Sequence, residues 1–307
     1  MWRYTFRRIL ATLPTLLAVV TLCWLLLRLA PGGPFDGERA VSPEVLANLQ
    51  AKYGLDKPAW QQYLQYLGNL LQGDLGPSFR YADWSVNELV ANALPVSATL
   101  GSVSLVLAVL IGVALGIAAA LRRNTVVDYA VMAIGNLGSV IPSFVIGPVL
   151  ILVFALWLKV LPAGGWDGFQ LRYMVLPVAL LTFINVAAIA RVMRGSLIET
   201  MHGNFIRTAR AKGMPARIVV LRHALRPALL PVVSVIGPLA ISSVTAALVT
   251  ETVFSLPGLG KLIVTGAGNR DYTLVLGLVV LITAVAVTFN LLVDLAYAAL
   301  DPKIRYA

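Results

Sequence analysis

Residues 97–121, SATLGSVSLVLAVLIGVALGIAAAL, contain no charged residue and no histidine. A helix needs about 20 apolar residues to cross a bilayer, so this stretch is long enough for one span. Five further uncharged runs lie at 9–27, 134–158, 173–190, 228–250 and 272–293. Hydrophobic residues make up 59% of the chain and charged residues 12%, which excludes a soluble globular domain. The sequence therefore predicts an all-α integral membrane protein, with six transmembrane helices in one domain over residues 1–307.

The first run follows a basic start, which is typical of a secretory signal peptide. It is longer than a usual signal-peptide core, however, and no small-x-small cleavage site follows it before Arg28. We therefore expect it to be a retained anchor. The only cysteine, Cys23, lies within this run, so an internal disulfide is excluded.

The positive charges predict the orientation of the chain. Lys and Arg residues concentrate in segments that share one side of the membrane, namely Arg3, Arg7, Arg8, Arg122, Arg123, the basic residues from Arg191 to Arg226, Lys303 and Arg305. Because cytoplasmic segments retain such residues, we expect both termini to be cytoplasmic. The net charge of +10 then reflects membrane topology and does not indicate nucleic-acid binding.

Residues 31–96 form a predicted extracytoplasmic insertion with three helix signatures. Ser42-Pro43-Glu44 is a helix start and Gly54 an end, while Ser85 and Glu88 form a capping box. Between them, a helix is expected from Pro58 to Gly73 with an aromatic and aliphatic face made of Trp60, Tyr63, Leu64, Leu67 and Leu71. Such a face suits either the membrane interface or a small lid packed on the membrane domain.

Site chemistry for catalysis or ion coupling is sparse. His202 and His223 have no second ligand at helical spacing, and the sequence has no phosphate-binding loop, so we expect no metal, no cofactor and no enzymatic activity. Asp294 is the one acid in a span-like stretch, with Asn290 one turn before it, and Glu251 is expected at a hydrated outer helix end. The prolines and glycines of the third to fifth runs favour a bundle that lines a pathway and moves.

The inside segment 194–227 contains a predicted docking element. Residues 204–213 are predicted to form a short helix with Phe205, Ile206 and Ala209 on one face, Gly213 as a left-handed stop, and Pro215 beginning the next helix. This helix suits the groove of a cytoplasmic protein, or alternatively an anionic lipid surface.

Residues 204–213 (NFIRTARAKG) with 222–225 (RHAL) resemble the "EAA" loop of ATP-binding-cassette (ABC) importer permeases, in their peptide and nickel branch. Residues 29–32, 251–260, 269–272 and 301–306 carry the resemblance along the whole chain. The general motif's glutamate is replaced by Arg207 and its first alanine by Thr208. The resemblance assigns ATPase coupling to Asn204, Phe205, Ile206, Arg207, Thr208, Ala209, Arg210, Ala211, Lys212, Gly213 and Pro215. Structural or gating candidates are Glu251, Pro257, Gly258 and Asp271 in the resembling segments, together with Asn290 and Asp294, for which the residue pattern alone favours a structural hydrogen bond over a proton relay.

The resemblance implies a type I ABC importer permease fold in a bacterial inner membrane. It implies a heterodimer with a second permease, two cytoplasmic ATPases that use the ATP, and an extracytoplasmic binding protein that delivers peptide. Oligopeptide is the expected substrate, with dipeptide or nickel as alternatives. In the rival class, an ion-coupled secondary transporter, function would depend on Asp294 or Glu251. Residues that contact the substrate are not identifiable from the sequence.

Overall fold

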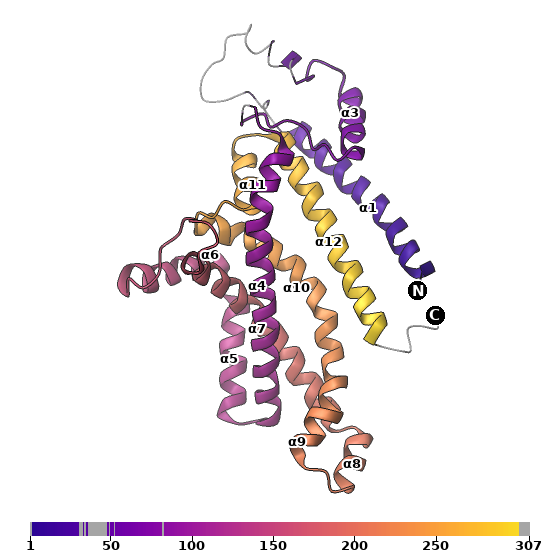
Figure 1. The fold of residues 1–307 in the computed structure, drawn as a ribbon, viewed down its shortest axis with the longest axis vertical. Coiled ribbons are helices and arrows are strands. Elements are labelled where there is room, and N and C mark those ends of the chain that lie inside the picture. The colour runs from indigo at the N-terminus through magenta and orange to yellow at the C-terminus, as the bar shows by residue number, and fades with distance from the viewer. Residues whose placement is uncertain are drawn as a thin grey trace. The chain divides into compact units, whose positions relative to one another are not determined.

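The computed structural model describes residues 2–30, 33, 35, 48, 50–51, 53–81 and 83–300, with the side chains of 2–12, 139, 244–246 and 292–300 left out of the description. These residues are mainly helical and form no strand beyond two isolated β-bridges. The helices are α1 (Trp2–Leu29), α3 (Ala59–Leu71), α4 (Val86–Leu121), α5 (Val126–Val140), α6 (Ser143–Leu150), the π-helix η1 (Ile151–Trp157), α7 (Leu171–Met201), α8 (Asn204–Ala211), α9 (Ala216–Ile218), the π-helix η2 (Val219–Ala224), α10 (Leu225–Val253), α11 (Leu259–Gly268) and α12 (Tyr272–Leu300) (Figure 1).

The chain divides into two compact units. Unit 1 contains residues 98–256 and short terminal pieces, and unit 2 contains residues 6–97 and 257–287. Both α4 and α12 contribute residues to each unit.

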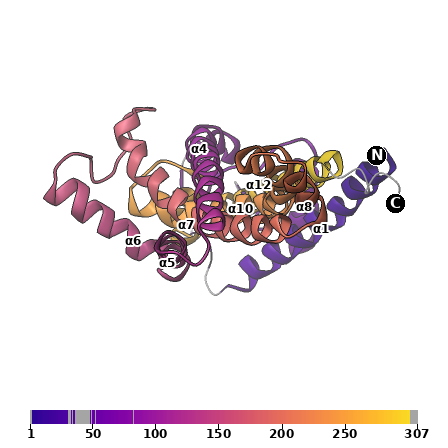
Figure 2. The same cartoon turned by 90° about the horizontal axis from the view of Figure 1, so that it is seen from below.

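Helix α7 is the centre of unit 1 and packs against α10, α5 and α4 (Figures 1 and 2). Two glycines one turn apart, Gly112 and Gly116, let α4 approach α7 closely. A Cβ at Gly112 would lie 2.8 Å from Ile189, and one at Gly116 would lie 2.6 Å from the Cβ of Met193. Such small-residue contacts are how membrane helices gain close van der Waals packing. The four-residue spacing of these glycines is a sequence signal for a close helix contact, although it does not name α7 as the partner.

Five of the six predicted apolar runs each lie within one helix. The third, 134–158, does not form a straight span: it breaks at Pro142, and the two arms, Val126–Gly138 and Ser143–Trp157, meet at a bend of 102°. Proline at that point removes a backbone donor, and an interruption of the helix was expected for this reason. Among the described residues, four helices are long and apolar enough to cross a membrane, or five with the bent pair. The six-span count therefore remains a prediction.

Two of the predicted helix signals of the insertion are confirmed where the structure describes them. Pro58 precedes α3, and Gly73, with φ of +78°, follows its end. Ser85 and Glu88 form the predicted capping box: the Glu88 carboxylate accepts from the Ser85 amide at 2.8 Å, and Ser85 Oγ accepts from the Glu88 amide at 3.2 Å. The helix start at Ser42-Pro43-Glu44 lies outside the described residues.

The core of unit 2 joins the start of α4 to α11 and the start of α12. Its buried residues are Val86, Val90, Ala93, Leu259, Leu274 and Leu278. Gly258, at the N-terminal cap of α11, is buried as well, while the adjacent Pro257 is exposed. Helix α11 therefore begins at a buried glycine, and the proline before it remains accessible.

Candidate functional site

Helix α8 begins at the residue that the sequence predicts for the docking helix and ends two residues before the predicted end at Gly213. It runs from Asn204 to Ala211, and Gly213 follows with φ of +75°, so the expected left-handed stop is confirmed. The Gly213 amide donates to the carbonyl of Arg210 at 2.9 Å, which closes the last turn. Pro215 then precedes α9. A Cβ at Gly213 would meet nothing within 4 Å, so the backbone conformation alone requires glycine there.

The apolar residues of α8 do not form one exposed face, contrary to the prediction from the sequence. Ile206 and Ala209 are buried in a core cluster that also contains Leu197 of α7 and Val219 of η2. Phe205 points elsewhere and is 49% exposed. The chain's own core therefore covers two of the three apolar side chains that we expected to meet another protein.

The residues of α8 and of its end that remain accessible are mostly basic and include one aromatic ring. Phe205, Arg207, Arg210 and Lys212 are exposed, as are Arg217, Arg222 and Arg226 in the residues that follow. No acidic residue occurs between 203 and 227. This arrangement, called the α8 surface below and defined by Phe205, Arg207, Arg210 and Lys212, suits an acidic partner with a pocket for an aromatic side chain.

An ion pair with a buried carboxylate and a partly exposed arginine fastens α5 to α7 near the same end of α7. Arg194 donates to both carboxylate oxygens of Asp128, at 2.5 and 2.6 Å, and the Asn124 amide donates to the same carboxylate at 2.9 Å. Asp128 is buried. Arg194 and Leu197 both belong to α7, so this helix takes part in the ion pair and also packs against α8. From the sequence these charges indicated only topology, since nothing in their spacing pairs residues 66 positions apart.

Buried polar side chains also join the three long helices of unit 1. The Asn185 amide of α7 donates to Ser243 Oγ of α10 at 2.9 Å, and the Thr182 hydroxyl donates to the carbonyl of Ser104 in α4 at 3.3 Å. Hydrogen bonds of this kind replace water as partner for polar groups inside a membrane. They were not predicted from the sequence, because uncharged polar residues do not interrupt an apolar run.

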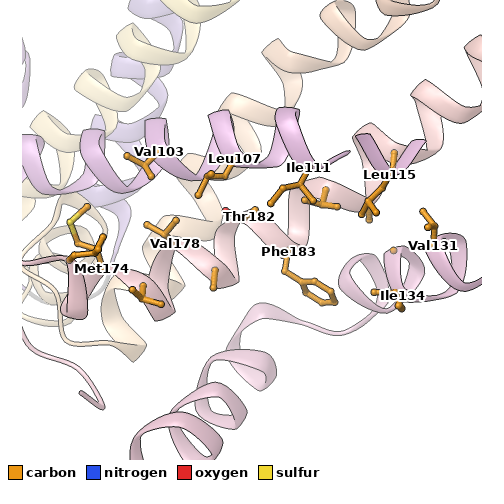
Figure 3. Close-up of a pocket in the computed structure, with 17 residues that line it drawn as sticks. Val103, Leu107, Ile111, Leu115, Val131, Ile134, Met174, Val178, Thr182 and Phe183 are labelled. Carbon is orange, nitrogen blue, oxygen red and sulfur yellow. The ribbon is translucent and has the colours of Figure 1, made fainter. Parts of the chain in front are cut away.

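An apolar groove of about 590 Å³ lies between α4, α5 and α7 (Figure 3). Val103, Leu107 and Ile111 of α4 face Val178 and Phe183 of α7 across it. Among the described residues that line this groove none is charged, and the one hydroxyl on its wall, that of Thr182, already donates to α4. The groove therefore offers van der Waals contact and no site for a charged ligand.

Of the structural or gating candidates, Asp271 has the most developed surroundings. It is fully buried directly before α12 and accepts hydrogen bonds from Ser78 Oγ and from the amides of Phe79, Arg80 and Leu274, the last three at 3.1 to 3.2 Å. The carboxylate thus caps α12 and holds residues 78–80 against it. The sequence singled out Asp271 but gave no means of finding Ser78.

The other acidic candidates differ from expectation or stay untested. Glu251, in the last turn of α10, is fully buried, so our expectation of a hydrated residue was wrong. The neighbouring residues Thr250, Phe254 and Leu256 are buried as well, so water is excluded from this helix end. Asn290 is exposed on α12, and the side chain of Asp294 lies outside the described residues, so the structural role expected for Asp294 stays a prediction. Within the described part of the chain, no three His, Cys, Asp or Glu residues are grouped as metal ligands would be.

Comparison with known proteins identifies the family. Residues 112–306 match the family described as the binding-protein-dependent transport system inner membrane component, and residues 1–100 match the N-terminal family of such membrane components. The chain belongs to this permease family. Two oligopeptide transport system permease proteins OppB, from Haemophilus influenzae and Escherichia coli, are 54% and 53% identical to it over 306 residues, covering 100% of both chains. A dipeptide transport system permease protein DppB from Bacillus subtilis is 41% identical, over 99% of this chain and 98% of its own.

A solved structure supports the fold of this permease. A chain of the MetNI methionine ABC transporter, described in inward-facing conformations, matches it with a TM-score of 0.59 at 20% identity, over 69% of this chain and 96% of its own. The predicted all-α, type I ABC permease fold is confirmed. Together with the apolar helices, the family identifies a multi-pass protein of the inner membrane.

Proposed function

We propose that this chain is one permease subunit of an ATP-driven, binding-protein-dependent oligopeptide importer, in which it forms half of the translocation pathway. Full-length identity above 50% to oligopeptide permeases, against 41% to a dipeptide permease, supports oligopeptide as the substrate. Dipeptide or nickel import is the alternative within the family.

The observation that carries the proposal is that the α8 surface is accessible while Ile206 and Ala209 of the same helix are buried. Two cytoplasmic ATPases would each receive one permease's short helix, and here the exposed Phe205 would enter an acidic groove. Arg207, Arg210 and Lys212 would pair with acids at the groove's rim. A second, similar permease would complete a heterodimer, and an extracytoplasmic binding protein would deliver peptide.

The buried contacts of α8 would transmit a force on this helix to the long apolar helices α7 and α10. Because Ile206 and Ala209 are buried with Leu197 and Val219, a displacement of α8 would be passed to α7 and to η2, which leads into α10. Closure of the ATPases around ATP would thus switch the permease between packed arrangements, with reopening releasing peptide inward. In this scheme both termini are cytoplasmic, and this chain binds no cofactor and catalyses no reaction of its own.

The test is uptake by cells that lack this gene and by cells in which it is restored. The panel contains peptides of two to five residues, and nickel. We expect cells that lack the gene to lose uptake of peptides of three or more residues, and cells in which it is restored to regain this uptake. If uptake of dipeptides or nickel is lost instead, the substrate is a dipeptide or nickel and not an oligopeptide. Normal uptake by Arg207→Glu and Phe205→Asp variants that insert stably would contradict the docking role of the α8 surface.

An ion-coupled secondary transporter remains the rival class, and the same cells distinguish it. Such a transporter would work without ATPase partners and would need an acid such as Asp294. We expect Asp294→Asn to retain uptake. Uptake that depends on Asp294 and persists after deletion of the ATPases would support the rival.

A further inference from the structure

Helix α3, in the extracytoplasmic insertion, exposes its most apolar side. Trp60, Leu64 and Leu71 are 62%, 57% and 90% exposed, and α3 has no buried residue. At 3.6 residues per turn, these three side chains lie within about 40° of one another around the helix axis. The predicted face also included Tyr63 and Leu67, but both are partly covered. The exposed part is therefore a narrow stripe, defined here as the α3 stripe of Trp60, Leu64 and Leu71.

A second side of α3 is fastened to the end of α1. The hydroxyls of Tyr63 and Thr21 share a hydrogen bond, and the Tyr63 ring lies 5.3 Å from the ring of Trp24 between centroids. Arg28 donates to the Gln62 side-chain carbonyl at 2.7 Å. The α1 residues in these contacts belong to its last turns before Leu29, beside which α3 lies in Figure 1. Helix α3 is thereby held beside the C-terminal turns of α1.

A third side of α3 is polar and consists of Gln61, Gln65, Asn69 and Gln72. Lys57 donates to Gln65 at 3.3 Å, which places a cation on this side. Helix α3 therefore has one polar surface and, in the α3 stripe, one exposed apolar surface. Exposed leucines also cover the neighbouring end of α1, namely Leu22, Leu25, Leu26 and Leu29. The helix to which α3 is fastened therefore also exposes an apolar surface.

We propose that α3 lies in the membrane interface and inserts the α3 stripe among lipid headgroups and the adjoining acyl chains. Tryptophan favours this zone because its ring is apolar and its N–H is polar, and amphipathic helices lie there with their apolar side buried. Helix α3 contains no charged residue, so insertion needs no anionic lipid. Its position is set by α1, whichever way the chain is oriented in the membrane.

The test uses the full chain, in its assembled complex or alone, with Cys23→Ala as background. Single cysteines replace Trp60, Leu64 and Leu71, with Gln61, Gln65 and Gln72 as matched controls on the polar side. Each cysteine carries an environment-sensitive fluorophore in phosphatidylcholine vesicles, with and without brominated acyl chains. We expect bromine to quench the stripe positions at least about two-fold more than the controls. Unlabelled stripe cysteines should react more slowly with a membrane-impermeant maleimide.

Two outcomes would overturn the proposal. Equal quenching and equal maleimide reactivity on both sides would place α3 in water. Unquenched stripe positions that become protected when the extracytoplasmic binding protein is added would assign the stripe to a protein partner. Because neither readout measures transport, failure here is distinct from failure of the proposed function.

Discussion

Helices α8 and α3 are both short amphipathic helices outside the apolar runs, yet the structure uses them in opposite ways. Helix α8 buries Ile206 and Ala209 in its own unit and leaves basic side chains accessible. Helix α3 has no residue that is buried as a whole, and it leaves Trp60, Leu64 and Leu71 accessible. The side that internal packing leaves open determines the chemistry of the partner, which we infer to be an acidic protein groove for α8 and lipid for α3.

The flanking chain accounts for this difference. Helix α8 lies between α7 and η2, which both supply apolar side chains beneath it. Helix α3 is flanked by turns, and α1 offers it Thr21, Trp24 and Arg28 through polar and aromatic contacts. Apolar burial therefore fixes α8, whereas hydrogen bonds and ring contacts fix α3.

The comparison is tested most strongly by Ile206→Ala. Truncating a fully buried isoleucine leaves a cavity under α8, and we expect the free energy of unfolding to fall by about 2–5 kcal/mol. Thermal unfolding of the detergent-solubilised chain measures this. The matched control is Phe205→Ala, which should change stability by less than about 0.5 kcal/mol yet lose uptake. Equal destabilisation by both variants would remove the distinction between a buried and an accessible side of α8.

The segment 78–80 should be held to the start of α12 by polar contacts, which Asp271→Asn tests. The amide group of asparagine has only one acceptor oxygen. Some of the donors, which are the Ser78 hydroxyl and the Phe79 and Arg80 amides, then lose their acceptor, which should lower the free energy of unfolding by about 1–3 kcal/mol. We expect faster hydrogen exchange of the Phe79 and Arg80 amides. Ser78→Ala, which removes one donor, should have a smaller effect. Unchanged exchange in Asp271→Asn would mean that apolar packing holds this segment as well.

The end of α8 should respond to Gly213→Val through its backbone alone. A β-branched residue in the left-handed region costs about 1–2 kcal/mol, and the structure offers no clash to add to it. We expect the protein to insert normally and to lose uptake, since the chain after α8 would be redirected. Gly213→Asn, which tolerates this region, should keep most uptake. Full uptake by a stable Gly213→Val protein would count against the coupling role of α8.

The smallest stability effect is expected for Trp60→Gln. In detergent, the exposed site should change the free energy of unfolding by less than about 0.5 kcal/mol. In phosphatidylcholine nanodiscs, hydrogen exchange of α3 should rise, because the helix loses its interfacial anchor. Gln61→Ala, on the polar side, is the control. Identical exchange of the two variants in lipid would argue against the contrast between α3 and α8.

Local rules were enough for many elements of this fold. The capping box at Ser85 and Glu88, the start of α3 after Pro58 and the stop at Gly213 all depend on residues a few positions apart, and the structure confirms each. The break at Pro142 was predictable in the same way, because proline lacks a backbone donor. The size of the bend, 102°, could not be predicted from the sequence. Of the candidate site, the bounds of α8 were predictable, but the exposure of its side chains was not.

The sequence by itself determined an all-helical membrane permease, because uncharged runs of bilayer length permit little else and the family motifs run along the whole chain. Only the tertiary structure decided that Asp128 pairs with Arg194, that Asp271 holds residues 78–80, and that Ile206 is buried while Phe205 is exposed. Periodicity places side chains on a helix face but does not say which face another segment covers. That depends on contacts between residues far apart in the chain, and these form only when the helices pack.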